Sequence, residues 1–180
     1  MRNYEERAKD FIKLVFPYIE SVDTVWEART AIELFNVQHN RKVKICNGLS
    51  RIALVTSDYV VKFDYDEEEI EVIGGCDIEV NLYNIAKQEG FDYLLAKVTP
   101  YEYNGHKYYI MPRIRGIGKY NWNEAYEFMT AQECNWCKSH HITDLHCNNY
   151  GFRNGHVCLV DYACSLDFLT SSIPSSRSFY

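Results

Sequence analysis

The sequence predicts an α+β fold with two lobes, and three observations support this prediction. Apolar residues recur at helical spacing over residues 4–21 and 23–35. Short runs rich in β-branched and aromatic residues follow over residues 42–64, and similar runs return near residues 94–111 after one helical stretch. The remaining chain combines a longer helical segment with a final hairpin. Strands interrupted by one helix and followed by a mostly helical part are typical of an α+β arrangement.

The first two elements are predicted to be helices. Pro17 is expected to kink or end the first one, because proline lacks the N–H that a helix interior uses. Asp23 or Thr24 is expected to cap the second one, because a short polar side chain there accepts a hydrogen bond from an unpaired backbone N–H. The apolar positions of the first helix are Ala8, Phe11, Ile12, Leu14, Val15 and Ile19.

Three strands are predicted between residues 42 and 64. They surround a loop at Asn47-Gly48-Leu49-Ser50 and a turn at Thr56-Ser57-Asp58. The acidic segment over residues 64–71 is expected to be a solvated connection, since its charges favour contact with water.

The next region is predicted to contain a helix and a hairpin. Asp77 is expected to cap a helix that runs to residue 87. Strands are expected over residues 94–98 and 107–111. Asn104-Gly105 lies between them and favours a type I′ turn, because both central residues of that turn need positive φ.

The last part of the chain is predicted to be mostly helical. A helix is expected over residues 122–139, a hairpin around Arg153-Asn154-Gly155, and a loose serine-rich tail from about residue 170. The elements group into an N-terminal helical extension (1–41), a β-rich lobe (42–114), a minimal helical lobe (115–170) and a tail (171–180).

Composition limits the class of protein. The 180 residues are 47% hydrophobic, which suits one domain or a small two-lobed unit. A net charge of −6 argues against a nucleic-acid partner, because lysine and arginine supply most of that affinity. The charged amino terminus does not resemble a signal peptide, and no apolar run reaches the length of a membrane span. Seven cysteines without a regular framework are expected to be reduced thiols, so we expect a cytoplasmic protein.

Three polar residues near the carboxyl end have the spacing of a phosphoryl-transfer site. Asp144 is followed five residues later by Asn149, and Asp161 comes directly after the apolar pair Leu159-Val160. Transfer of a phosphoryl group from ATP needs a carboxylate that orients the hydroxyl nucleophile, together with an amide oxygen and a second carboxylate that hold Mg²⁺. Taken alone, Asp144 and Asn149 are better explained as ordinary turn residues that hydrogen-bond their own backbone.

An upstream lysine supplies a second indication. Lys62 lies within the apolar run Val60-Val61-Lys62-Phe63, where an unpaired ammonium group is costly to bury. Glu79 lies on the next predicted helix and is the best candidate partner. The alternatives are a purely structural ion pair between the two residues and a Lys62 that faces solvent from an edge strand.

This ordered set of residues resembles the protein-kinase-like superfamily. Residues 144–149 match the catalytic-loop pattern D-L-x-x-x-N, and Asp161-Tyr162-Ala163 stands at the D-F-G position. With His146 the loop reads D-L-H-x-x-N, which is similar to aminoglycoside-phosphotransferase-like kinases and to short kinase-like proteins encoded by bacteriophages. The segment from Gly48 to Ala53 resembles the G-x-[SA]-R-x-[VA] version of the nucleotide-covering turn in those phage proteins. The resemblance covers roughly residues 42–163.

The resemblance implies ATP and Mg²⁺ as cofactors and a reduced two-lobed protein-kinase-like fold. The acceptor would be a protein or a small molecule, and the compartment would be a host cytoplasm if the chain is viral. Each polar residue would then have a role. Lys62, held by Glu79, would bind phosphate oxygens, Asp144 would be the catalytic base, and Asn149 and Asp161 would bind the metal. His146 would interact with the transferring phosphate or with Asp144. Gly48, Ser50 and Arg51 would contact phosphates, and the strand ending at Met111 would contact adenine.

Departures from the pattern keep an alternative open. Ile142 and Thr143 replace the usual His-Arg, which implies that activation-loop phosphorylation does not control the site. The chain reaches Tyr180 soon after Asp161, where conventional kinases have a large helical platform. The alternative function is therefore a pseudokinase or binding module, for example a phage protein that inhibits a host or defence protein by direct contact.

A zinc site is the main competing interpretation. Cys134-Asn135-Trp136-Cys137 has the spacing of zinc ligands. Both cysteines fall within a helical pattern, however, where such a pair usually belongs to the core. The other residues of this candidate set are His140, His141, His146 and Cys147.

Overall fold

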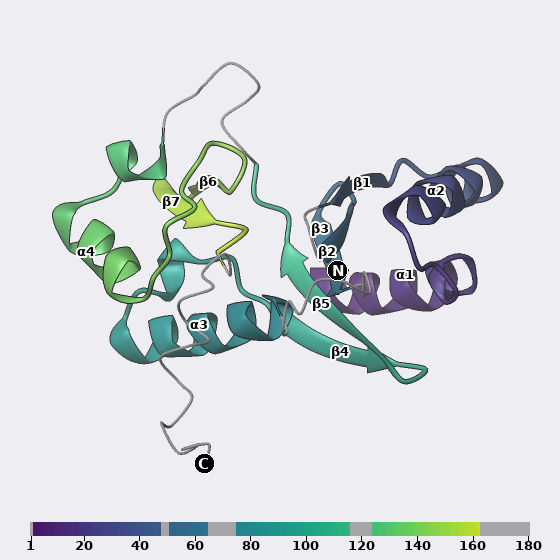
Figure 1. Ribbon diagram of the computed structural model, residues 1–180, viewed down its shortest axis with the longest axis horizontal. Helices are drawn as coiled ribbons and strands as arrows, with labels where there is room; N and C mark the ends of the chain where they lie inside the picture. Colours follow the sequence, from purple (N-terminus) through teal and green to yellow (C-terminus); the bar gives the residue numbers. More distant parts are fainter. Residues whose placement is uncertain (1, 48–50, 65–74, 116–123, 163–180) are drawn as a thin grey trace, which may run out of the picture.

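The computed structural model describes residues 2–47, 51–64, 75–115 and 124–162. Within these ranges the chain forms four α-helices, two short 3₁₀ helices, a five-stranded antiparallel sheet and a two-stranded sheet. The predicted α+β class is confirmed. In Figure 1 the two N-terminal helices lie beside strands β1–β3, while α4, β6 and β7 lie at the opposite end of the molecule.

The five-stranded sheet has the order β1-β2-β3-β5-β4. In its register Ala53 lies opposite Lys62, and Lys62 lies opposite Tyr109. Lys62 therefore occupies a strand with a neighbour on each side, and its side chain is buried. The five strands are β1 (Lys44–Asn47), β2 (Arg51–Val55), β3 (Tyr59–Asp64), β4 (Thr99–Tyr103) and β5 (His106–Pro112).

Helices α1 (Tyr4–Ile19) and α2 (Val25–His39) cover one face of this sheet. Pro17 lies inside α1, and the helix ends two residues later. Thr24 is the N-cap of α2 and forms a capping box with Glu27. The Thr24 side chain accepts from the Glu27 backbone N–H, and the Glu27 side chain accepts from the Thr24 backbone N–H. The shared core includes Phe11, Val15, Ile32 and Phe35 from the helices and Ile52, Leu54, Val61 and Ile110 from the sheet.

The opposite face of the sheet packs against α3 (Gly75–Glu89) and the second half of the chain. Side chains alternate across a strand, so Val60 packs on this side while Val61 packs under α1 and α2. The hairpin of β6 (Tyr150–Arg153) and β7 (His156–Leu159) completes this core. Its members include Leu82, Leu94, Tyr109, Met111, Trp136, Leu159 and Tyr162.

The strand predicted over residues 94–98 is wrong. A 3₁₀ helix, Asp92–Leu94, occupies its start, and β4 begins at Thr99. Leu95 forms only one parallel bridge with Leu159, and Ala96 N–H donates to the Leu159 carbonyl at 2.8 Å. The apolar side chains of this segment are buried in the core without forming a regular ladder, and periodicity alone does not distinguish such a segment from a strand.

The helix predicted over residues 122–139 is interrupted. The described part contains a 3₁₀ turn, Ala125–Phe128, and then α4 (Ala131–Ser139). Thr130 has extended backbone, and its hydroxyl accepts from Glu133 N–H in a capping box. A threonine side chain that satisfies a free helix-end N–H favours a new helix start over a continuous helix.

The start of α3 also differs from the prediction. The helix begins at Gly75, so Asp77 lies in its first turn rather than at the N-cap. The Asp77 carboxylate instead accepts from the Tyr109 hydroxyl at 2.8 Å and pairs with Lys107 at 3.3 Å. These contacts join α3 to β5.

Among the described helices, none combines the length and apolarity needed to cross a membrane.

The ion pair that joins α1 to the sheet should depend on pH. Glu5 accepts from Lys97 at 2.7 Å and from Thr99 at 3.1 Å, and the hydrogen bond from Lys97 lowers the pKa of Glu5. A lowered pKa stabilises the fold above the unfolded value, about 4.3, and this contribution disappears as pH falls through the folded pKa. We expect Glu5→Gln to lower the free energy of unfolding by about 0.5–1 kcal/mol at pH 7 and by almost nothing near pH 2.5.

Urea unfolding at both pH values measures this difference. Glu102→Gln, which changes an exposed glutamate of β4, is the control for a general loss of negative charge. A deficit in Glu5→Gln that is equal at both pH values would contradict the assignment.

Gly151 permits a close approach of β6 to the segment that leaves β5. A Cβ atom at position 151 would overlap the backbone carbonyl of Arg115 and lie 2.8 Å from Ile114 Cγ2. Because backbone atoms cannot rotate away, we expect Gly151→Ala to destabilise the protein by about 1–3 kcal/mol. Gly155→Asn is the matched control, since φ there is +83° with open space around it and asparagine tolerates that conformation. Thermal unfolding of both variants checks the difference.

Candidate active site

Lys62 and Glu79 form the buried centre of the candidate site. Lys62 Nζ lies 2.8 Å from Oε1 and 2.9 Å from Oε2 of Glu79. Glu79 is fully buried on α3, and Lys62 reaches it from β3. The structure thus contains the ion pair that the sequence suggested, and Lys62 does not face solvent from an edge strand.

Burial controls the protonation of Glu79. Desolvation raises the pKa of the Glu79 carboxyl, while the nearby Lys62 and Arg51 cations lower it and partly offset that effect. A charged pair this deep is maintained only with several hydrogen bonds. The Tyr162 backbone N–H supplies another, at 3.4 Å from Oε1.

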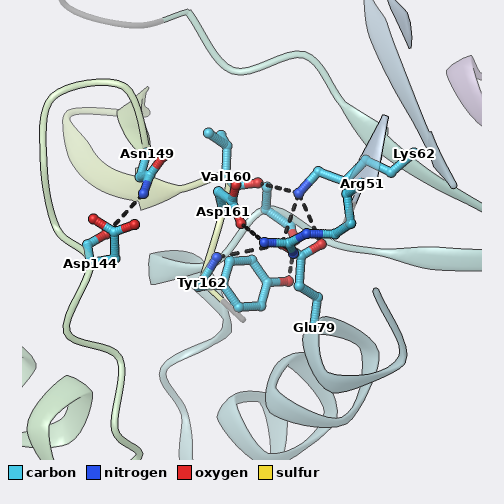
Figure 2. Close-up of polar contacts among 9 residues, drawn as sticks. Arg51, Lys62, Glu79, Asp144, Asn149, Val160, Asp161 and Tyr162 are labelled. Atoms are coloured by element: carbon cyan, nitrogen blue, oxygen red, sulfur yellow. Dashed lines mark hydrogen bonds and ion pairs between the residues drawn. The ribbon is translucent and has the colours of Figure 1, made fainter. Parts of the chain in front are cut away.

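Lys62 also binds the segment after β7, which carries Asp161. Its Nζ donates to the Val160 carbonyl at 2.8 Å. The side chain therefore joins three elements: β3, α3 and the segment after β7 (Figure 2). Tyr162 anchors that segment from the other side, because its hydroxyl donates to the Ala96 carbonyl at 2.8 Å.

Arg51 lies between the two carboxylates. Its Nη1 is 3.2 Å from Glu79 Oε1, and its Nη2 is 2.8 Å from Asp161 Oδ1. The Arg51 stem runs against the start of α3, since a Cβ at Gly75 would lie 3.2 Å from Arg51 Cδ. The resemblance to kinase-like proteins implied that Arg51 contacts phosphate. In the structure its guanidinium group contacts Glu79 and Asp161.

The loop around Asp144 is held by local hydrogen bonds. His146 Nε2 lies 3.2 Å from Asp144 Oδ1, and His146 Nδ1 accepts from the Asn148 N–H at 3.2 Å. Because Nδ1 is an acceptor, the ring proton sits on Nε2 and is donated to Asp144. This contact between His146 and Asp144 orients the carboxylate.

Asn149 connects this loop to the strand before Asp161. The Asn149 side-chain Nδ2 donates to the Asp144 backbone carbonyl at 3.2 Å. The Asn149 backbone carbonyl accepts from the Val160 N–H at 2.8 Å. The first bond leaves Oδ1 as the acceptor end of the amide. In Figure 2 Asp144 and Asn149 lie on one side of residues 160–162, and Arg51, Lys62 and Glu79 lie on the other.

These donors fit Mg²⁺ chemically. An amide oxygen from Asn149 and a carboxylate from Asp161 are hard oxygen ligands, and Mg²⁺ is usually held by one or two protein oxygens together with water and phosphate. Asp161 is about one-third exposed, with a side-chain relative accessibility of 35%, so its carboxylate is accessible from outside. The side chains needed to hold the metal are thus present on neighbouring segments.

The other residues that the resemblance assigns to the nucleotide are Gly48, Ser50 and Met111. Gly48 and Ser50 lie outside the described residues. Met111 is on β5 and is buried in the core that contains α3. The segment that follows β5 is described only as far as Arg115.

The cysteine and histidine residues do not assemble a zinc site in the part of the chain that the structure describes. No group of three or more His, Cys, Asp or Glu side chains there is arranged to hold a metal ion. Cys137 is buried in the core, and Cys134 Sγ points toward the Tyr126 carbonyl at 3.9 Å. His140 stacks on Trp136 with ring centroids 4.5 Å apart.

Sequence reasoning missed the contact between Arg51 and the carboxylates. A usable signal was present, because residues two apart on a strand share a face. In the register of β2 and β3, Ala53 lies opposite Lys62, so Arg51 lies on the Lys62 face. The carbonyl of Val160 carries no side-chain signal and was not predictable as a partner of Lys62.

A comparison of the chain with models of protein families and with curated proteins finds no match.

Proposed function

We propose that this protein is a minimal kinase-like phosphotransferase that moves the γ-phosphate of ATP to a hydroxyl group. The observation that carries the proposal is the Lys62–Glu79 pair, which is bound through the Val160 carbonyl to the segment of Asp161. A lysine on a central strand, a glutamate on the following helix and a metal-binding aspartate are three parts that phosphoryl transfer requires in one place.

The sheet supports the same proposal. Three antiparallel strands lead into α3, and β5 then pairs beside β3 with β4 at the edge. Lys62 and Glu79 lie on facing elements, and Asn149 is hydrogen-bonded to Val160, the residue before Asp161. The kinase-like fold is therefore part of the proposal.

Each residue would contribute by position and charge. Lys62, oriented by Glu79, would bind phosphate oxygens. Asp144, oriented by the His146 Nε2–H, would accept the hydroxyl proton of the acceptor. Asn149 and Asp161 would hold Mg²⁺, which neutralises phosphate charge when bound. The acceptor is a protein or small-molecule hydroxyl, and the proposed location is the cytoplasm, that of a host cell if the chain is viral.

Ligand binding comes first among the tests. We expect ATP to raise the thermal midpoint in the presence of Mg²⁺, and to do so much less with EDTA. A ligand at 100 times its dissociation constant stabilises the folded state by about 2.7 kcal/mol. The same preparation, supplied with labelled ATP, should release or transfer the γ-phosphate, and Asp144→Asn should retain the binding while losing most of that activity.

The second candidate function is a pseudokinase or a binding module, for example a phage protein that inhibits a host or defence protein. The contact of Arg51 with Asp161 favours it, because that carboxylate already has a cation partner. ATP binding without any γ-phosphate release, or no ATP binding at all, would support this candidate over the first.

A further inference from the structure

The Asp161 carboxylate contacts Arg51 and is also the carboxylate that would bind a divalent cation. Arg51 Nη2 contacts Asp161 Oδ1 at 2.8 Å, and Asp161 is the only carboxylate assigned to the metal. The Arg51 side chain is mostly buried, with a relative accessibility of 13%, and its stem lies against Gly75. The guanidinium side of the contact is therefore packed, while the Asp161 carboxylate is about one-third exposed.

The four side chains joined by these ion pairs carry equal numbers of positive and negative charges. Arg51 and Lys62 carry two positive charges, while Glu79 and Asp161 carry two negative ones. A guanidinium group offers a fork of donors that can hold two carboxylates at once, and Arg51 uses it to join Glu79 and Asp161. A divalent cation on Asp161 would add positive charge a few ångströms from Arg51, and like charges at that separation repel strongly where solvent is limited.

We propose that Arg51 is a latch on the metal-binding carboxylate: its guanidinium group holds Asp161 in the metal-free protein and competes with the divalent cation for that residue. This inference rests on the proposed function, since it takes Asp161 as a metal ligand. Metal binding then requires the Arg51–Asp161 contact to break or weaken. The affinity of the site for metal is set by this competition as well as by the ligands themselves.

Binding of Mn²⁺ alone tests the latch without depending on activity. The dissociation constant of Mn²⁺ is measured by calorimetry or by the paramagnetic resonance signal of the free ion, at fixed ionic strength. Arg51→Gln should bind Mn²⁺ about tenfold more tightly than the natural protein, because a charge-assisted hydrogen bond of this kind no longer competes. The tightening should be absent when Asp161→Asn is combined with Arg51→Gln.

Arg7→Gln is the matched control. Arg7 also pairs with a partly exposed aspartate, Asp58, but on α1 and the β2–β3 turn. The Arg7→Gln variant loses the same charge as Arg51→Gln, from a similar pair. Its affinity for Mn²⁺ should equal that of the natural protein. Arg51→Lys keeps the charge but cannot hold both carboxylates, so it should also bind Mn²⁺ more tightly and serves if Arg51→Gln does not fold.

The outcomes separate the latch from the proposed function. Equal Mn²⁺ affinity in the natural protein and the folded Arg51 variants would overturn the latch, and so would a tightening that persists with Asp161→Asn. If ATP with Mg²⁺ still stabilises the natural protein in that case, the proposed function stands alone. If no variant binds Mn²⁺ and ATP has no effect, both inferences are overturned.

Discussion

Replacing Asp161 with asparagine is expected to remove the Mg²⁺-dependent stabilisation by ATP and to lower γ-phosphate release by at least about 100-fold. An amide in place of the carboxylate removes a negative charge from the proposed metal site while keeping the shape of the side chain. ATP without Mg²⁺ should affect the variant and the natural protein equally. The thermal midpoint with ATP, measured with Mg²⁺ and with EDTA, gives the first result, and a phosphate-release assay gives the second.

A loss of folding cannot explain this result if the ligand-free stability is nearly unchanged. Asp161 is about one-third exposed, so losing its pair with Arg51 should cost only about 1 kcal/mol or less. Asp58→Asn is the matched control, because Asp58 is also partly exposed and paired with an arginine. It should leave ATP stabilisation and phosphate release unchanged. Equal effects of Mg²⁺ in the natural protein and in Asp161→Asn would show that the metal does not use this carboxylate.

Replacing Glu79 with alanine is expected to cause the largest loss of stability, about 3–5 kcal/mol. The change leaves the buried Lys62 ammonium group without its carboxylate and removes one partner of Arg51. Uncompensated buried charge is much more costly than the loss of an exposed pair. Urea unfolding at pH 7 measures the difference, provided that the slope of the free energy against urea stays constant.

Lys62→Met separates the cost of a lone cation from the cost of a lone carboxylate. Glu79 would remain buried, but it can take up a proton, and burial already raises the pKa of this carboxyl. A raised folded pKa stabilises the folded state below the unfolded pKa, and this stabilisation is lost as pH rises through the folded value. The deficit of Lys62→Met relative to the natural protein should therefore shrink as pH falls from 8 toward 5. A deficit that grows over this range would mean that Glu79 is not the group that responds.

Several helices, caps and turns could be predicted from local sequence. Helices α1 and α2 follow from apolar residues at helical spacing, and Thr24 is a recognisable cap because its side chain satisfies a backbone N–H at the helix end. The β4–β5 hairpin follows from Asn104-Gly105, where both residues have positive φ. Such features depend on neighbours within a few residues, so the sequence carries them.

Two of the errors have different origins. Leu94, Leu95, Ala96 and Val98 are apolar because they belong to the core, and Leu95 has a bridge partner, Leu159, in a distant hairpin. The long helix predicted over residues 122–139 breaks at Thr130, whose side chain caps a new helix, α4. At residues 94–98 packing decided the backbone structure, whereas at Thr130 a local capping box did so.

The same division holds for the candidate site. The sequence by itself determined which polar residues are present, in what order, and that a lysine in an apolar strand needs a carboxylate partner. Only the tertiary structure decided that Arg51 turns to Glu79 and Asp161, and that Lys62 binds the Val160 carbonyl. The physical reason is that these contacts join residues up to 110 positions apart in the chain. Their geometry is fixed by strand register and by the packing of α3 against β3, which no local pattern encodes.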